Sequence, residues 1–310
     1  MGRHSNVALK ERSRSSDGAV GKKAKGGTLA PILVVLLGLA VLLYPVVSTQ
    51  WNNFAQTRAA QAYSQLDVAT PPEVNDAQWD AAHEYNRTKN TGVILDPWLA
   101  RVSKDNIPYQ EYLSQLNSSD VMGRIIVPGA KADLPIYHGT DDKTLSKGVG
   151  HLFGSDLPVG GQSTHSVLTG HTGLPNATLF DNLTDVKKGQ AFYVQVAGHK
   201  LKYEVHDIRV VEPHETDSLR PVEGQDLMTL ITCTPYGVNT HRLLVTGHQV
   251  PMDPKDEGVF DQKGPHIQWW MWAILAFAVL VLIALARWVY KMRQKSIVAQ
   301  HDNEGDSTNA

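Results

Sequence analysis

Residues 227–246, LMTLITCTPYGVNTHRLLVT, carry the pattern from which the fold can be predicted. Two runs rich in apolar and β-branched residues, 227–232 and 242–246, flank a loop that contains a proline and a glycine. Runs of this kind, separated by turn-forming residues, are typical of neighbouring β-strands. Cys233, the only cysteine in 310 residues, directly follows the first run. The thiol is therefore expected at a strand end beside a loop, where functional side chains are often displayed.

Five more runs of the same kind lie upstream of this pair, between residues rich in Gly, Pro and Asp. They occupy residues 123–127, 134–137, 166–169, 191–196 and 201–211. Residues 197–200, Ala-Gly-His-Lys, are expected to form a hairpin loop between two of them. Seven or eight short strands at this spacing predict a mainly β domain, a sandwich or a closed barrel, over residues 120–252.

Two long apolar runs lie outside this domain, at residues 29–48 and 267–286. Twenty helical residues rise about 30 Å, which matches the hydrocarbon core of a bilayer. Three tryptophans mark the beginning of the second run, as expected at a membrane interface. We therefore predict two transmembrane helices.

Basic residues predict the orientation of these spans. Residues 1–26 carry seven Lys and Arg against two acidic residues, and four basic residues lie within residues 287–295. Because basic flanks stay in the cytoplasm, both termini are expected inside and residues 49–266 outside. A cleaved signal peptide is the alternative for the first run, but this run exceeds the usual 7–15 apolar residues of such peptides. In either case the middle domain is exported.

Four further segments complete the expected organisation. Residues 1–26 are expected to form a disordered cytoplasmic tail, and residues 287–310 a second cytoplasmic tail that is disordered over about its last 15 residues. Residues 49–88, which are rich in Ala and Gln and broken by Pro71 and Pro72, are expected to form a helical linker. Residues 89–110 form a long polar loop, either a lid or a plain connection.

Composition excludes several classes of function. The net charge of −2 argues against a dedicated nucleic-acid binder, which normally carries a basic excess. A single cysteine excludes a disulfide framework. The thirteen histidines form no HExxH motif, and a CxxC pair is impossible with one cysteine, so we expect no metal site.

An exported, solitary cysteine is buried and inert, paired between chains, or catalytic. A catalytic thiol needs a neighbouring base or positive charge to become a thiolate near neutral pH. His171 and His248 both occur in a Thr-Gly-His context, and the residue pattern leaves both open. Arg242 could stabilise an oxyanion. If Arg242 reaches Cys233, His248 is disfavoured, because six strand residues span about 20 Å.

Thr-Leu-Ile-Thr-Cys at residues 229–233, followed by Arg242, resembles the TLxTC…R signature of sortases, the membrane-anchored cysteine transpeptidases of Gram-positive bacteria. Residues 132–183 resemble the segment that carries the catalytic histidine in this family, with His171 in the catalytic position. Asp-Pro-Trp at residues 96–98 resembles the lid of the pilin-polymerising group, class C, which the second span also fits.

The resemblance implies an eight-stranded β-barrel with N-terminal helices, flanked by the two transmembrane helices. It also implies that Cys233 attacks an LPxTG-like sorting signal, that His171 protonates the leaving amine, and that Arg242 contacts the substrate or oxyanion. The implied partners are pilin subunits that carry the sorting signal and an acceptor lysine, and no cofactor is implied.

The same resemblance implies a lid of Asp96, Pro97 and Trp98, with Trp98 over Cys233 and Asp96 near Arg242. The sequence is also compatible with two alternatives. A housekeeping sortase would attach proteins to cell-wall peptide, and a non-enzymatic, membrane-tethered binding domain would use Cys233 for no chemistry.

Overall fold

A computed structural model describes residues 29–89, 96–98, 102–103, 105–261, 264 and 266–306, with side chains through residue 295. The expected N-terminal tail and much of the expected lid loop lie outside the described residues. The structure divides into two units. One comprises residues 41–279 and holds the β domain, and the other comprises the helix ends before residue 41 and after residue 279.

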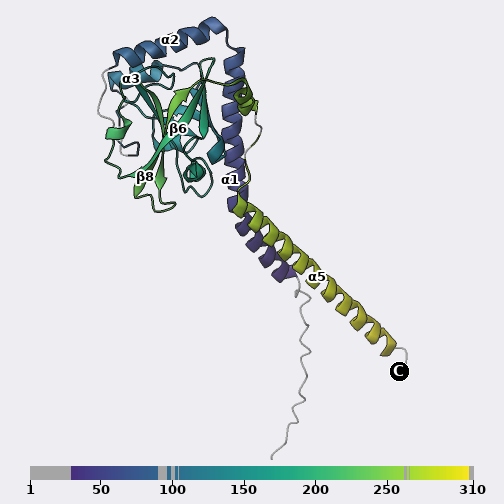
Figure 1. The fold of residues 1–310 in the computed structure, drawn as a ribbon. Helices are drawn as coiled ribbons and strands as arrows, with labels where there is room; N and C mark the ends of the chain where they lie inside the picture. The colour runs from purple at the N-terminus through teal and green to yellow at the C-terminus, as the bar shows by residue number, and fades with distance from the viewer. Residues whose placement is uncertain are drawn as a thin grey trace, which may run out of the picture. The chain divides into compact units, whose positions relative to one another are not determined.

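The β domain is a closed barrel of eight strands, which confirms the expected fold class (Figure 1). The strands follow one another around the barrel in the order β1-β2-β3-β4-β7-β8-β6-β5. Their bounds are β1 Gly123–Val127, β2 Ala132–His138, β3 Val149–His151, β4 Thr164–Thr169, β5 Ala191–Val196, β6 His199–Val211, β7 Asp226–Thr234 and β8 His241–Val250.

Each of the seven runs found in the sequence corresponds to one strand, and β3 is the strand that sequence reasoning missed. It has only three residues, one of them a glycine, so it shows no periodicity. The hairpin between β5 and β6 is tighter than expected. Val196 pairs with His199, which leaves a two-residue turn of Ala197 and Gly198 with positive φ angles of 45° and 78°. Positive φ at both central residues is typical of a type I′ turn.

The helices are α1 Leu29–Ala69, α2 Pro72–Thr88, α3 Ile107–Ser114, α4 Asp142–Leu145 and α5 Trp269–Asp306. Short 3₁₀ segments lie at η1 Pro128–Ala130, η2 Asp181–Asp185, η3 Asp217–Leu219 and η4 Pro254–Asp261.

Three of these helices differ from the sequence-based boundaries. α1 joins the first apolar run and the first half of the linker in one helix, because residues 46–69 contain no Gly or Pro. α3 begins inside the expected lid loop, where Asn106 caps it by accepting a hydrogen bond from the Tyr109 N–H. α5 continues to Asp306, so most of the expected disordered C-terminal tail is helical, because residues 287–304 also lack Gly and Pro.

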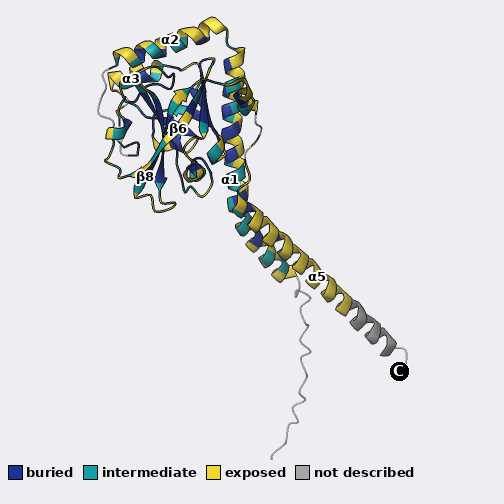
Figure 2. Cartoon of the chain, in the orientation of Figure 1, coloured by how far each residue is buried: buried dark blue, intermediate teal, exposed yellow. Residues whose placement is uncertain are grey.

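α1 and residues 269–295 of α5 are long and apolar enough to cross a membrane, by length and composition. Only 11% of the most apolar stretch of each helix is buried. Figure 2 shows most of α5 in the colour of exposed residues. Exposed apolar surface of this extent is typical of a membrane-facing helix, so the two helices suggest membrane association.

Polar contacts attach the C-terminal part of α1 to the barrel. Ser64 donates a hydrogen bond to the side chain of Gln195 in β5 over 2.7 Å. Asp67 accepts hydrogen bonds from the Gln195 side chain and from the Gly198 N–H at the β5–β6 turn, over 2.8 and 2.7 Å. The C-terminal part of α1 is therefore packed on the barrel and belongs to the same domain.

Candidate active site

Strand register brings His171 and Cys233 to the same end of two neighbouring strands. β4 and β7 are parallel, and Thr169 pairs with Ile231. The contact continues beyond the strands, because the Gly170 N–H donates to the Ile231 carbonyl over 3.0 Å and the Thr232 hydroxyl donates to the Gly170 carbonyl over 2.8 Å. His171 lies two residues after Thr169, and Cys233 lies two residues after Ile231.

Arg242 joins the same end from the other side of β7. β7 and β8 are antiparallel, and Cys233 pairs directly with Arg242. The same register pairs His248 with Leu227, six residues back along β7. The structure thus places His171, and not His248, at the end of β7 that carries Cys233, as the reach of a single strand requires.

Residues 96–98 cover this end of the barrel. Asp96 is 4% exposed and forms a bidentate ion pair with Arg242, with Nε–Oδ2 and Nη2–Oδ1 distances of 2.6 and 3.2 Å. The Trp98 N–H donates to Asp96 Oδ1 over 3.0 Å, and the Thr140 hydroxyl donates to the Pro97 carbonyl over 2.8 Å. These contacts attach the segment to Arg242 through Asp96 and to Thr140 through Pro97.

Trp98 contacts two of the three candidate catalytic residues. The Arg242 guanidinium carbon lies 4.6 Å from the centre of the indole, a cation–π contact. The indole N–H donates to Nδ1 of His171 over 3.3 Å. Because an indole N–H only donates, Nδ1 acts as an acceptor, and the neutral imidazole carries its proton on Nε2.

The electrostatics of the covered site favour uncharged Cys233 and His171. Burial raises the pKa of the Cys233 thiol, the Asp96 carboxylate raises it further, and Arg242 only partly opposes them. Burial also lowers the pKa of His171, against the opposing effect of Asp142. Both shifts oppose a thiolate–imidazolium pair while residues 96–98 stay in place.

The sequence did not predict that hydrogen bonds fix the conformation of the loop that follows His171. The Phe180 N–H donates to the His171 carbonyl over 3.1 Å. Asp181 accepts hydrogen bonds from the Thr172 hydroxyl and the Gly173 N–H over 3.1 and 2.8 Å, and burial raises its pKa to about 6. Nothing in the sequence of this segment indicated which acid closes the loop.

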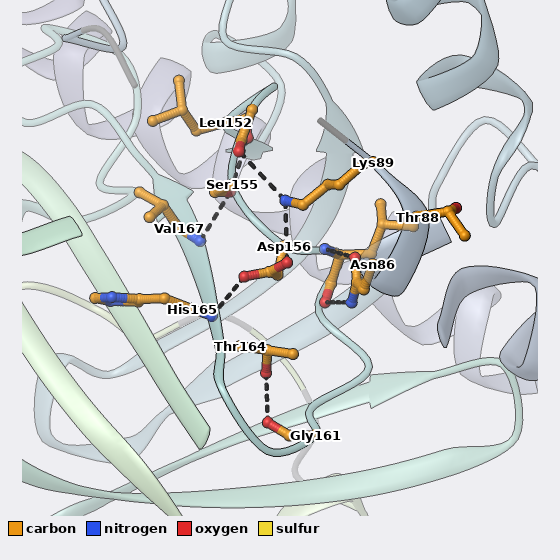
Figure 3. Close-up of polar contacts among 12 residues, drawn as sticks. Asn86, Thr88, Lys89, Leu152, Ser155, Asp156, Gly161, Thr164, His165 and Val167 are labelled. Atoms are coloured by element: carbon orange, nitrogen blue, oxygen red, sulfur yellow. Dashed lines mark hydrogen bonds and ion pairs between the residues drawn. The ribbon is translucent and has the colours of Figure 1, made fainter. Parts of the chain in front are cut away.

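A buried polar network, drawn in Figure 3, fixes the start of the segment that leads to residues 96–98. The Lys89 ammonium, at the end of α2, lies 3.0 Å from Asp156 and donates to the Gly154 carbonyl over 3.2 Å. The other oxygen of Asp156 accepts from the His165 N–H over 2.7 Å. On the far side of the segment, Tyr112 of α3 hydrogen-bonds His151. No sequence motif indicated these anchors.

Metal ligation has no support among the residues that the structure describes. They contain no group of three or more His, Cys, Asp or Glu side chains arranged to hold a metal ion. What the site does present is a thiol, an imidazole and a guanidinium, which can act as nucleophile, proton donor and oxyanion-stabilising group in acyl transfer.

Comparisons with known proteins point to the same chemistry. Residues 125–250 match the family model described as "Sortase domain". Sortase A of Streptococcus agalactiae is 30% identical over 222 residues, which cover 70% of this chain and 81% of that protein.

Solved structures are more similar. Sortase C-1 of Actinomyces oris is 60% identical, with a TM-score of 0.57, over 58% of this chain and 99% of that chain. Sortase A of Corynebacterium diphtheriae is 51% identical (TM-score 0.59; 65% and 95%), and a structure of that enzyme is described as a lid mutant. Sortase C of Streptococcus pneumoniae is 36% identical (TM-score 0.58; 63% and 97%), and its description refers to pilin substrate specificity.

Proposed function

This chain belongs to the sortase family of cysteine transpeptidases, and we propose that it is a class C member that joins pilin subunits covalently at the outer face of the membrane. The observation that carries the proposal is the contact of residues 96–98, the lid, with the site. Asp96 forms an ion pair with the Arg242 guanidinium, and the Trp98 indole N–H donates a hydrogen bond to His171 Nδ1. The sortase C structures among its neighbours support the same assignment.

The first half of the proposed reaction is acylation of Cys233. The Cys233 thiolate attacks the carbonyl carbon of the Thr–Gly bond in an LPxTG-like sorting signal. The C–N bond breaks, and the His171 imidazolium donates its proton to the departing glycine amine. Arg242, released from Asp96, donates hydrogen bonds to the substrate carbonyl oxygen as it gains negative charge. The product is a thioester on Cys233.

The second half transfers the acyl group. A lysine amine of another pilin subunit attacks the thioester, gives a proton to His171, and forms an isopeptide bond as Cys233 leaves as a thiolate. Both halves use only side chains of this protein and its substrates, so the proposed reaction needs no cofactor.

The proposed location follows from the two apolar helices and the basic residues around them. Both helices span the membrane, both termini lie in the cytoplasm, and the barrel lies outside, where sorting signals of exported proteins arrive. This arrangement anchors the enzyme at the surface on which its product is assembled.

The test of the acylation step uses the full chain in detergent micelles with an LPxTG peptide. Wild type, Asp96→Ala and Cys233→Ala are compared by intact-protein mass spectrometry. We expect a thioester adduct that increases in Asp96→Ala and is absent in Cys233→Ala. Absence of an adduct in both wild type and Asp96→Ala, also with the sorting-signal peptide of a pilin, would contradict the proposal and favour a binding domain.

The acceptor separates class C from a housekeeping enzyme. The Asp96→Ala chain is incubated with a purified pilin subunit that carries an LPxTG signal, without any cell-wall peptide. A ladder of covalent polymers on a denaturing gel supports pilin polymerisation. A thioester between Cys233 and the monomer that is resolved only by an added wall-peptide amine indicates the housekeeping reaction instead.

A further inference from the structure

The loop that follows His171 is held from outside the barrel by α1. The Asn53 amide nitrogen donates to the Thr178 hydroxyl over 2.8 Å, and the Thr178 N–H donates to the Asn53 amide oxygen over 3.0 Å. Asn52 donates to the Asn176 carbonyl over 2.8 Å. Asn53 and Thr178 are 7% and 8% exposed. One buried amide with two bonds fixes both the position and the orientation of Thr178.

The path from Thr178 to His171 is closed by hydrogen bonds within the loop. The Asp181 N–H donates to the Thr178 carbonyl over 2.8 Å, and the Phe180 N–H donates to the His171 carbonyl over 3.1 Å. The Phe180 ring packs so closely on Gly170 that a Cβ there would lie 2.6 Å from the ring. A displacement of Thr178 is therefore transmitted to the backbone of His171.

α1 is itself fixed at a second place. Its hydrogen bonds through Ser64 and Asp67 reach β5 and the β5–β6 turn, on strands that are not neighbours of β4 in the barrel. Asn53 lies three helical turns before Ser64, so the helix connects this anchored region to the His171 loop as a rigid element. The loop thus has a fixed reference outside its own strands.

We propose that Asn53 is a positioning residue for His171, so that the helix that continues from the membrane anchor forms part of the catalytic framework. This inference rests on the proposed function, because it assigns His171 to acid–base chemistry. Acyl transfer requires the imidazole to be placed between the thiol and the leaving amine, and a displacement of about 1 Å lowers rates by up to about 100-fold. Loss of Asn53 should therefore slow chemistry more than it weakens binding.

The test measures single-turnover thioester formation by the full chain in micelles, with an LPxTG peptide and Asp96→Ala as the parent. We expect Asn53→Ala to lower the maximal rate by about 10-fold or more while the half-saturating peptide concentration stays within about twofold. Thr178→Val, which removes one of the two bonds and keeps the shape, should lower the rate by a smaller factor. The double variant should be no slower than Asn53→Ala, because both changes break one contact.

Asn75→Ala is the matched control. Asn75, in α2, is also 7% exposed and donates one hydrogen bond over 2.9 Å, but its partner is the Asp67 carbonyl near the end of α1, away from the His171 loop. Asn75→Ala should lower the melting temperature about as much as Asn53→Ala and leave the maximal rate within about twofold of the parent.

Two results would overturn the role of Asn53. One is a parental maximal rate in both Asn53→Ala and Thr178→Val, and the other is an equal loss of rate in Asn75→Ala. The absence of an adduct in the Asp96→Ala parent would instead contradict the proposed function itself, and with it any role of Asn53 in the reaction.

Discussion

Arg242 Nε lies 2.6 Å from Oδ2 of Asp96, and both side chains are at least nine-tenths buried. In the proposed reaction the same guanidinium stabilises the substrate oxyanion. The lid carboxylate therefore occupies the place where substrate oxygen gains charge, and it competes with the substrate for Arg242.

Asp96→Ala is expected to raise the rate of Cys233 alkylation by iodoacetamide by about 10-fold or more, because loss of the ion pair leaves Arg242 without the lid carboxylate that holds residues 96–98 in place. Peptide mass spectrometry of the alkylated cysteine measures the rate. Asp105→Ala, an exposed acid farther along the same segment, is the control and should leave the rate unchanged. Equal rates in Asp96→Ala and wild type would show that the ion pair does not hold the lid closed.

The pH dependence of alkylation should shift in Trp98→Ala. Burial raises the pKa of Cys233 and lowers that of His171 in the covered site. Removing the indole exposes both groups, so the thiol pKa falls and the imidazole pKa rises, and the thiolate–imidazolium pair forms at lower pH. The midpoint of the rate–pH curve should therefore move to lower pH. A change in amplitude with the midpoint unmoved would contradict this account.

Lys89→Met should destabilise the barrel strongly. Lys89 and Asp156 form an ion pair with side chains 7% and 4% exposed, and removal of one partner leaves a buried charge. We expect a loss of about 3–5 kcal/mol in the free energy of unfolding, measured by denaturant titration of tryptophan fluorescence. Lys188→Met, which breaks the exposed pair with Asp207, is the control and should cost less than about 1 kcal/mol. Similar losses of unfolding free energy in the two variants would show that the Lys89–Asp156 pair contributes no more to stability than an exposed ion pair.

His151 should make the barrel sensitive to acid. Its side chain is fully buried, and burial lowers its pKa to about 3. The unfolded chain takes up this proton near the ordinary value of about 6.5. Stability is therefore lost progressively as the pH falls from about 6.5 toward 3.

His151→Gln removes this titration, so its free energy of unfolding should fall less steeply than that of wild type between pH 6.5 and 4, although it starts lower at pH 7.5. The exposed His214 provides the control, because His214→Gln should keep the wild-type slope. A wild-type slope in His151→Gln would assign the acid sensitivity to other groups.

Sequence patterns predicted the barrel because its strands are long enough to carry their own signal. Runs such as β1 and β5 were located to the residue, whereas β3 has three residues and depends on its neighbours for its conformation. The pairing of Cys233 with Arg242 agrees with their spacing in the sequence, since a short loop joins β7 and β8.

Other parts of the site depend on tertiary contacts that leave no trace in local sequence. The residue pattern alone did not decide between His171 and His248. The decision depends on the parallel register of β4 and β7, which pairs positions 62 residues apart. In the sequence, Asn53 is one of many polar residues in the predicted helical linker, and Lys89 is the first residue of the expected lid loop. Their roles emerge only where the folded chain buries them against the barrel.

The closed ring of strands constrains how an extended peptide can be recognised. Many peptide-binding domains capture an extended ligand by adding it as a further strand to a free sheet edge. In this barrel β4 and β7 are already paired on both sides, with β3, with each other and with β8. Their main-chain groups are therefore not free to form a ladder with a sorting signal. Recognition has to come from side chains and loops, so selectivity can be altered by exchanging a loop without disturbing the hydrogen-bonded framework beneath it.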